Sequence, residues 1–344
     1  MQAVKIGGNQ AGQRFDKFLF KYLPEAHGSF LYKMLRKKNI VLNGKKAEGK
    51  EILRPGDEVK FFFSDETIER FGGGGSGLAA VSENKTAPES YMEAFRLLMG
   101  IKISYEDNHI LILNKPAGIL TQKAAPDDMS LNEWMIGYVM SREDYQPQEH
   151  MAFKPSVCNR LDRNTSGLVL CGKTLAGTQI LSEIIRERRV RKFYRTIVTG
   201  NLTEPLKLEG HLKKNPKTNK SHIQRHPVRG GDSYIQTYCQ PLHNSDDLTY
   251  LEVELITGKP HQIRSHLSSI GHPVAGDGKY GNEEWNARLR KQYGLKHQLL
   301  HAYRLEFPEL TGTLSQLSGL VVTAPLPEYF IRILSEHLPA KDGI

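Results

Sequence analysis

Apolar residues recur at helical spacing in several separate segments of the chain. In the first of these, every third or fourth residue contributes to one apolar stripe, formed by Phe15, Phe18, Leu19, Tyr22 and Leu23. Such a stripe is typical of an amphipathic helix with one buried face. The same criterion, with proline or glycine at the ends, predicts helices over residues 14–23, 29–38, 180–185 and 260–271.

Short apolar runs bounded by turn residues predict strands. The run 192–200 is apolar on both faces, so we expect it to be a central strand. The run 40–44 ends in Asn43-Gly44, a dipeptide typical of tight hairpins. The predicted strands cover residues 40–44, 58–63, 101–109, 110–118, 155–158, 168–172, 192–200 and 248–256.

This order of elements divides the chain into three parts. Residues 1–64 form a small unit of two helices and a few strands, and residues 91–340 form a large α+β domain. Between them, residues 65–90 are rich in glycine and polar residues, which predicts a flexible linker. Its glycine run follows no apolar strand and has no Gly-Lys-Ser/Thr ending, so it does not indicate a nucleotide-binding loop.

The segment 159–167 places a carboxylate at a strand end. Asp162 is followed by turn residues and then by the apolar run 168–172. If a strand runs through the segment, Arg160 and Asp162 project from one face, and the cation favours the ionised form of the carboxylate. A catalytic role is one interpretation of this pattern. An Asx turn or a cap is the other, because Asp before Asn-Thr often serves that purpose.

A second polar segment, 257–281, contains the helix predicted to begin at Pro260. His261, Arg264, Ser265 and Ser268 share one face of that helix, opposite its apolar stripe. His261 and His266 are five residues apart and therefore lie on different sides, and no thiolate or carboxylate completes a ligand set. No metal site is predicted.

Basic residues are dense in two places. Six of the ten residues from 186 to 195 are Lys or Arg, and the C-terminal half of the helix 29–38 is similarly basic. Either stretch is compatible with a solvated helix face or with RNA phosphates. The RNA-binding candidates are Lys33, Arg36, Lys37, Lys45, Arg188, Arg189, Arg191, Lys192, Lys259 and His261.

Composition narrows the class of partner. The 344 residues carry a formal net charge of +9 and a pI of about 9.2, which favours nucleic acid. No apolar run reaches membrane-spanning length and no signal pattern is present, so no membrane partner is expected. Three widely spaced cysteines suggest reduced thiols, and we expect a cytoplasmic protein.

Several motifs resemble one enzyme family. Asn159-Arg-Leu-Asp-Arg-Asn-Thr-Ser-Gly-Leu168 is similar to the His-Arg-Leu-Asp-x-x-Thr-Ser-Gly-Leu signature of the RluA-type pseudouridine synthases, with Asn159 in place of His. The family's Lys-Pro-x-Gly, Lys-x-Tyr-x-x-x-Val-x-Gly and Thr-Gly-Arg-x-His-Gln-Ile-Arg motifs correspond to residues 114–118, 192–200 and 257–264, with Lys259 replacing Arg. Residues 1–64 resemble the S4-type RNA-binding domain, with Phe30 where an arginine is common.

The resemblance implies a pseudouridine synthase fold with a mixed, largely antiparallel central sheet. It implies an isomerase (an intramolecular transferase) that converts uridines of RNA to pseudouridine without cofactor or metal. Asp162 corresponds to the essential aspartate, Arg264 to its arginine partner and Tyr194 to the functional tyrosine, while Arg160 is expected to hold the flipped geometry or to fill the vacated stack.

The S4-like unit favours large-subunit ribosomal RNA, and transfer RNA is the alternative substrate. Two other classes stay open. One is an inactive RNA-binding or ribosome-assembly protein. The other is a glycoside hydrolase, which normally needs a second carboxylate, with Asp277 the obvious candidate. A monomer is expected because no conspicuous surface apolar run is present.

Overall fold

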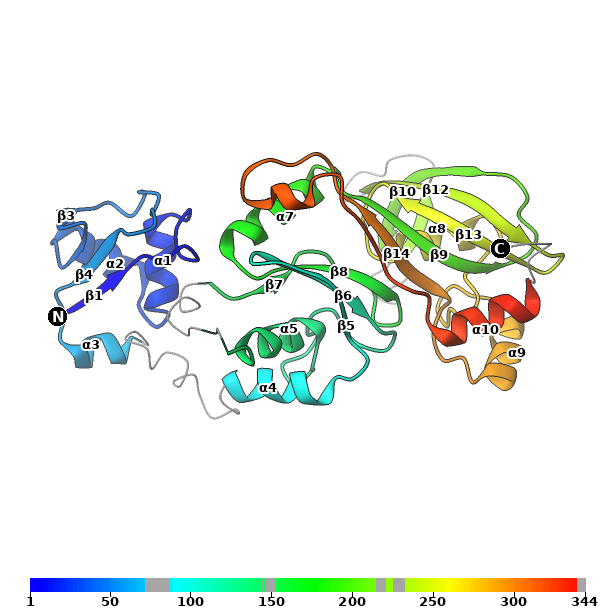
Figure 1. Cartoon of the computed structure of the whole chain (residues 1–344), viewed down its shortest axis with the longest axis horizontal. Helices are drawn as coiled ribbons and strands as arrows, with labels where there is room; N and C mark the ends of the chain where they lie inside the picture. Colours follow the sequence, from blue (N-terminus) through cyan, green and yellow to red (C-terminus); the bar gives the residue numbers. More distant parts are fainter. Residues whose placement is uncertain (72–86, 144, 146–152, 215–220, 225–232, 339–344) are drawn as a thin grey trace.

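The strands of the computed structural model form two sheets, a small one at the left of Figure 1 and a large one that extends from the middle of the molecule to the right. The structure describes residues 1–71, 87–143, 145, 153–214, 221–224 and 233–338. No helix within these ranges has the length and apolar character needed to span a bilayer.

The N-terminal unit packs two helices on a four-stranded antiparallel sheet with the order β1-β4-β2-β3. Asn43 and Gly44 both have positive φ angles, as the tight β2–β3 hairpin requires. The predicted helices and strands are confirmed here, and the structure adds the N-terminal strand. The elements are β1 Gln2–Lys5, α1 Phe15–Tyr22, α2 Gly28–Arg36, β2 Ile40–Leu42, β3 Lys45–Lys46 and β4 Glu58–Phe61.

The segment expected as a linker is partly helical. Helix α3 (Asp65–Arg70) buries Ile68 in the core of the N-terminal unit, and Phe71 packs against Phe30. Helix α4 (Ala87–Leu97) packs on α5 of the large domain. Helices α3 and α4 therefore occupy the two ends of the segment 65–90. The glycine run lies outside the described residues.

The large domain is built on an eleven-stranded sheet. Nine strands follow the order β11-β10-β12-β13-β9-β14-β8-β6-β5, while β15 pairs with β14 and β7 with β8. Among the described strands only β14 and β8 pair in parallel, so the predicted mixed, largely antiparallel sheet is confirmed. The strands are β5 Lys102–Glu106, β6 Ile110–Lys115, β7 Ser156–Val157, β8 Ser166–Gly172, β9 Arg191–Thr199, β10 Leu206–Lys214, β11 Ser221–Gln224, β12 Ser233–Asn244, β13 Leu248–Leu255, β14 Leu300–Glu306 and β15 Val321–Thr323.

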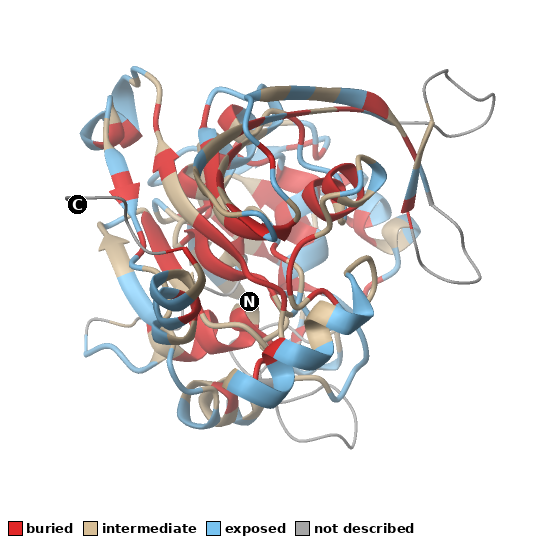
Figure 2. Ribbon diagram, turned by 90° about the vertical axis from the view of Figure 1, so that its right-hand side faces the viewer, coloured by how far each residue is buried: buried red, intermediate tan, exposed pale blue. Residues whose placement is uncertain are grey.

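Helices cover both faces of this sheet, so alternate residues of its central strands enter different cores. In β6, Leu111 and Leu113 pack with α5 and α8, whereas Ile110 and Ile112 pack with α7. Figure 2 shows the buried residues gathered in the strands and the exposed ones on the outer helices. The helices are α5 Leu131–Met140, α7 Leu175–Arg186, α8 Gln262–Ser269, α9 Glu283–Tyr293 and α10 Glu328–His337, with a 3-10 turn η1 Gly312–Leu317.

Helix α8 begins later than its sequence predicts. His261 adopts the left-handed conformation, with φ of 57°, and the helix starts at Gln262. Pro260 therefore lies in the preceding turn, not in the first helical turn. A residue in the left-handed conformation changes the direction of the chain just before the helix begins. Histidine adopts this conformation more readily than most residues.

Candidate active site

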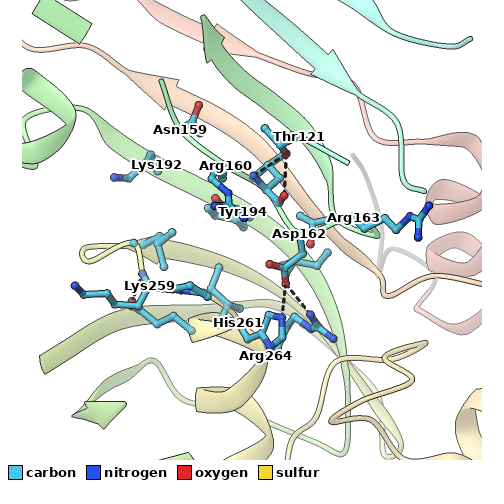
Figure 3. Close-up of a pocket in the computed structure, with 18 of the residues that line it drawn as sticks. Thr121, Asn159, Arg160, Asp162, Arg163, Lys192, Tyr194, Lys259, His261 and Arg264 are labelled. Atoms are coloured by element: carbon cyan, nitrogen blue, oxygen red, sulfur yellow. Dashed lines mark hydrogen bonds and ion pairs between the residues drawn. The ribbon is translucent and has the colours of Figure 1, made fainter. Parts of the chain in front are cut away.

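Asp162 lies in the loop that joins β7 to β8. No strand runs through this loop, so the condition under which Arg160 and Asp162 would share a strand face is not met. The backbone itself closes the turn, because the N–H of Thr165 donates to the main-chain carbonyl of Asp162 at 3.0 Å. The carboxylate is thereby left out of the turn and points into a cavity (Figure 3).

One hydroxyl fixes the main chain on the N-terminal side of Asp162. Thr121 Oγ1 donates to the Leu161 carbonyl at 2.8 Å and accepts from the Leu161 N–H at 3.1 Å. On the other side, the carbonyl of Arg163 accepts from the N–H of Gly118 at 2.9 Å. The loop that follows β6 therefore holds the β7–β8 loop at the residues on both sides of Asp162.

The start of β8 depends on a glycine. Gly167 has φ of 112°, and a Cβ atom there would lie 2.2 Å from the carbonyl oxygen of Ala302 on β14. Only glycine permits this close parallel pairing. Close by, Asn159 Oδ1 accepts from the N–H of Leu170 at 2.7 Å, so the residue that replaces the family's histidine ties the loop to β8.

A buried lysine supports the same loop. Lys115 ends β6, is fully buried, and donates from Nζ to the carbonyls of Pro116, Ile119 and Arg163 at 3.0, 2.9 and 3.1 Å. Burial lowers the pKa of Lys115 to about 7, although the charge of Asp162 raises it. The side chain has no access to RNA, and its role is to hold the loop.

Replacing this lysine is expected to destabilise the fold in a pH-dependent way. Lys115→Met leaves three carbonyls without their donor, which lowers the free energy of unfolding by about 1–3 kcal/mol at neutral pH. The pKa of Lys115 is about 7 in the folded protein and 10.5 in the unfolded chain, so the unfolded chain binds more protons between these values. The free energy of unfolding of the unaltered protein therefore increases as pH rises through this window. The variant has no lysine at this position, so its free energy of unfolding does not show this increase.

Urea unfolding of both proteins across this pH window measures the effect. We expect the difference in free energy of unfolding to widen as pH rises. A constant difference would contradict the assigned titration of Lys115.

Arg264 on α8 bridges two carboxylates. Its Nη1 donates to Asp162 Oδ2 at 2.6 Å, while Nε and Nη2 donate to the two oxygens of Asp277 at 2.6 and 2.8 Å. The Asp277 side chain is fully buried, and its Oδ1 also accepts from the N–H groups of Lys279 and Tyr280. Asp277 therefore orients the guanidinium, which presents its remaining edge to Asp162.

Electrostatics keep Arg264 and Asp277 charged. Burial disfavours the charged forms of both Arg264 and Asp277, but their mutual hydrogen bonds and attraction outweigh it. The pKa of Arg264 is consequently raised and the pKa of Asp277 lowered. Asp162 thus has a permanent cation at hydrogen-bonding distance, as predicted for Arg264, whereas Arg160 makes no ion pair with it in the described structure.

The cavity beside Asp162 measures about 630 Å³, within the range of roughly 300–1,000 Å³ typical of small-molecule sites. Tyr194 and Lys192 line it from β9. They are two residues apart and therefore project from the same face of the strand. Burial, and next the charge of Asp162, raises the pKa of Tyr194, so its hydroxyl stays neutral. The cavity brings together the sequence-predicted residues Arg160, Asp162, Lys192, Tyr194, Lys259, His261 and Arg264.

The lining is strongly cationic. Arg163 joins the predicted cations, and Asp162 is the one carboxylate among the described lining residues. Within the described ranges no cluster of histidine, cysteine and carboxylate side chains has the arrangement of a metal site. The cavity is therefore suited to an anionic ligand that must meet a single carboxylate.

Three predicted RNA contacts from 186–195 lie elsewhere. Arg191 projects from the opposite face of β9 to Lys192 and pairs with Glu254 and Glu306 at 2.8 Å each. Arg189 donates to the carbonyl of Glu309, and Arg188 is exposed with φ of 60°. Strand alternation explains the division, since neighbours such as Arg191 and Lys192 cannot share a face.

The N-terminal candidates are exposed. Helix α2 buries Leu31, Met34 and Leu35, while its basic residues face solvent, and the β2–β3 hairpin carries another basic residue. Phe30, in contrast, packs against Phe63 and Phe71. The exposed predicted residues are Lys33, Arg36, Lys37 and Lys45.

Comparison with known proteins agrees with this geometry. Residues 109–269 match the family model described as RNA pseudouridylate synthase. The ribosomal large subunit pseudouridine synthase C of Vibrio cholerae is 30% identical over 308 residues, which cover 89% of each chain. The protein of the same name from Escherichia coli is 29% identical and covers 99% of this chain and 98% of its own.

A solved structure supports the fold. Human RNA Pseudouridylate Synthase Domain Containing 4 superposes with a TM-score of 0.56 at 22% identity, covering 72% of this chain and 95% of the human one. The similarity in sequence extends over nearly the whole chain, and the matched family region contains Asp162, Tyr194 and Arg264. The chain therefore belongs to the RluA family of RNA pseudouridine synthases.

Proposed function

We propose that this isomerase converts uridine to pseudouridine in large-subunit ribosomal RNA and that Asp162 carries out the chemistry. The observation that supports the role of Asp162 most directly is its position as the single carboxylate of a cationic cavity. Its side chain is 25% exposed and paired with Arg264, so it is both accessible and oriented. A target nucleotide drawn out of the RNA brings its phosphates towards the cations and its base towards the carboxylate.

The same geometry disfavours the glycoside hydrolase alternative. Such an enzyme normally needs two carboxylates that flank the scissile bond with a separation of roughly 5–9.5 Å and open access to it. Asp277, the candidate second carboxylate, is fully buried and holds Arg264 with both oxygens. It is unavailable to a substrate in the cavity.

The isomerisation balances without an added reactant. The bond between N1 of uracil and C1′ of ribose breaks, the base turns, and C5 bonds to C1′. N1 gains one proton and C5 loses one. Asp162 acts on the flipped nucleotide as the nucleophile or base that begins this sequence, and the hydrogen bond from Arg264 orients its carboxylate.

The remaining lining residues hold the substrate. Tyr194 presents its ring to the cavity and packs against the extruded base. Arg160 is exposed at the cavity. There it holds the flipped nucleotide in place or occupies the position that the uridine leaves in the RNA stack. Lys192 and Lys259 supply charge for the neighbouring phosphates.

Ribosomal RNA is the preferred substrate because relatives that are similar over most or all of the chain are named ribosomal large subunit pseudouridine synthases. The N-terminal unit is proposed to act as an S4-like RNA-binding domain, supported by the exposed cations of α2 and the β2–β3 hairpin. The enzyme is proposed to act as a monomer. A ribosomal substrate is in keeping with the expected cytoplasmic location.

The test is release of tritium from carbon-5-labelled uridine. Isomerisation expels this tritium because C5 becomes the glycosidic carbon. Unmodified large-subunit, small-subunit and transfer RNA are compared as substrates. We expect release from large-subunit RNA alone. Release only from transfer RNA would overturn the proposed substrate, and no release from any RNA, with binding retained, would overturn the proposed activity.

Two adjacent residues provide a matched test of RNA contact. Lys192→Met removes a cation from the cavity, so RNA affinity should fall and the slope of log affinity against log salt should decrease by about 1. Arg191→Gln alters the opposite face of β9, where the ion pairs involve Glu254 and Glu306, and should leave both quantities unchanged. Filter binding at several salt concentrations measures them. Equal losses for the two variants would contradict the assignment.

A further inference from the structure

His261 lies beside the carboxylate of Asp162, and the isomerisation proposed above gives it no role. Its ring lines the cavity, with Nε2 3.9 Å from Asp162 Oδ2 and Nδ1 3.0 Å from the hydroxyl of Tyr280 (Figure 3). The side chain is 23% exposed. The left-handed backbone at His261 directs the ring there from the turn before α8.

The hydrogen bonds around Tyr280 determine which nitrogen of His261 carries the proton. The N–H of Ser221 on β11 donates to the Tyr280 oxygen at 2.7 Å. A phenol has one proton, and within the described residues Nδ1 of His261 is the one acceptor in reach of it. Tyr280 therefore donates to Nδ1, and the hydrogen of the neutral imidazole lies on Nε2.

The ring is neutral for a physical reason. Burial lowers the pKa of His261, and the charges of Arg264 and Lys279 lower it further, while Asp162 and Asp277 raise it. At 3.9 Å the Nε2–H is too far from Asp162 for a hydrogen bond. The described structure thus contains an N–H donor without a partner, aimed into the cavity next to the reacting group.

We propose that His261 binds the substrate through Nε2–H, which donates a hydrogen bond to a carbonyl oxygen of the uracil held against Asp162. This inference rests on the proposed function. When the N1–C1′ bond breaks, negative charge develops on the detached uracil and spreads over its carbonyl oxygens. A fixed neutral donor stabilises that charge without neutralising Asp162, as a protonated histidine would.

Tyr280 and Ser221 give this donor its orientation. The guanidinium of Arg264 lies 5.2 Å from the centre of the Tyr280 ring, so the tyrosine is packed against the same arginine that aims Asp162. Tyr280 thus links the three parts of the site. Its hydroxyl contacts Ser221 of β11 and His261, and its N–H donates to Asp277, the partner of Arg264.

The test compares two substitutions of equal length. His261→Gln keeps an N–H donor at about the position of Nε2, whereas His261→Met has none, and both place a non-glycine residue on the same left-handed backbone. Single-turnover tritium release is measured at saturating unmodified large-subunit RNA, together with RNA affinity and the midpoint of thermal unfolding. We expect His261→Met to lose about a hundredfold in rate, with RNA affinity and thermal midpoint equal to those of His261→Gln. We expect the single-turnover rate of His261→Gln to be at least about tenfold higher than that of His261→Met.

Equal rates for the two variants, or a loss confined to RNA affinity, would overturn the role of His261 while the unaltered enzyme still releases tritium. Absence of release by the unaltered enzyme would overturn the proposed function and this inference with it. The two failures are thereby distinguished within one experiment.

Discussion

Asp162→Asn is expected to abolish pseudouridine formation, lowering the single-turnover rate by more than about 10⁴-fold. Asparagine has the same shape as aspartate, so the loop held by Thr121 and Lys115 keeps its geometry. The amide is, however, neither a nucleophile nor a base at neutral pH. Tritium release at saturating RNA measures the effect, and the variant should retain the RNA affinity of the unaltered enzyme.

The same variant should fold normally. The Asp162 side chain is 25% exposed, and Arg264 keeps Asp277 as its counter-ion, so loss of the charge changes the free energy of unfolding by at most about 1 kcal/mol. A variant that retains more than a hundredth of the activity would assign the chemistry to another group.

Arg264→Met is expected to damage both stability and activity. It leaves the Asp277 carboxylate fully buried without a cation, which costs about 3–5 kcal/mol. It also removes the donor that aims Asp162, so the rate should fall by about a hundredfold or more in the molecules that remain folded. Urea unfolding and tritium release below the unfolding midpoint measure the two effects.

A double variant separates these effects. In Arg264→Met/Asp277→Asn no buried charge remains, and the amide oxygen still accepts from the N–H groups of Lys279 and Tyr280. Stability should therefore recover by at least about 2 kcal/mol, while activity stays low. Recovery of activity along with stability would show that Arg264 acts only by supporting the fold.

Sequence patterns predicted most of the elements and the main residues of the site. Periodicity located β9 as a central strand and α8 as a helix, and motif resemblance brought Asp162, Tyr194 and Arg264 together although they lie far apart in the chain. These predictions succeed because alternation and helical spacing are local properties.

Several features depend on contacts that no local pattern contains. Thr121 holds Leu161 across forty residues, and only the folded loop places them together. From sequence alone Asp277 is a candidate second carboxylate, whereas in the structure it is the buried partner of Arg264. Strand alternation places Arg191 on the face of β9 opposite Lys192, a division that the density of cations in 186–195 does not reveal by itself.

The central claim is that Asp162 isomerises uridine without releasing the base. The most direct measurement is nucleoside analysis of unmodified large-subunit RNA after incubation, by chromatography and mass spectrometry, alongside tritium release from the same sample. The account predicts one pseudouridine for each tritium released by the unaltered enzyme, no free uracil, and neither product with Asp162→Asn. Free uracil, abasic RNA, or pseudouridine formed by Asp162→Asn would contradict it.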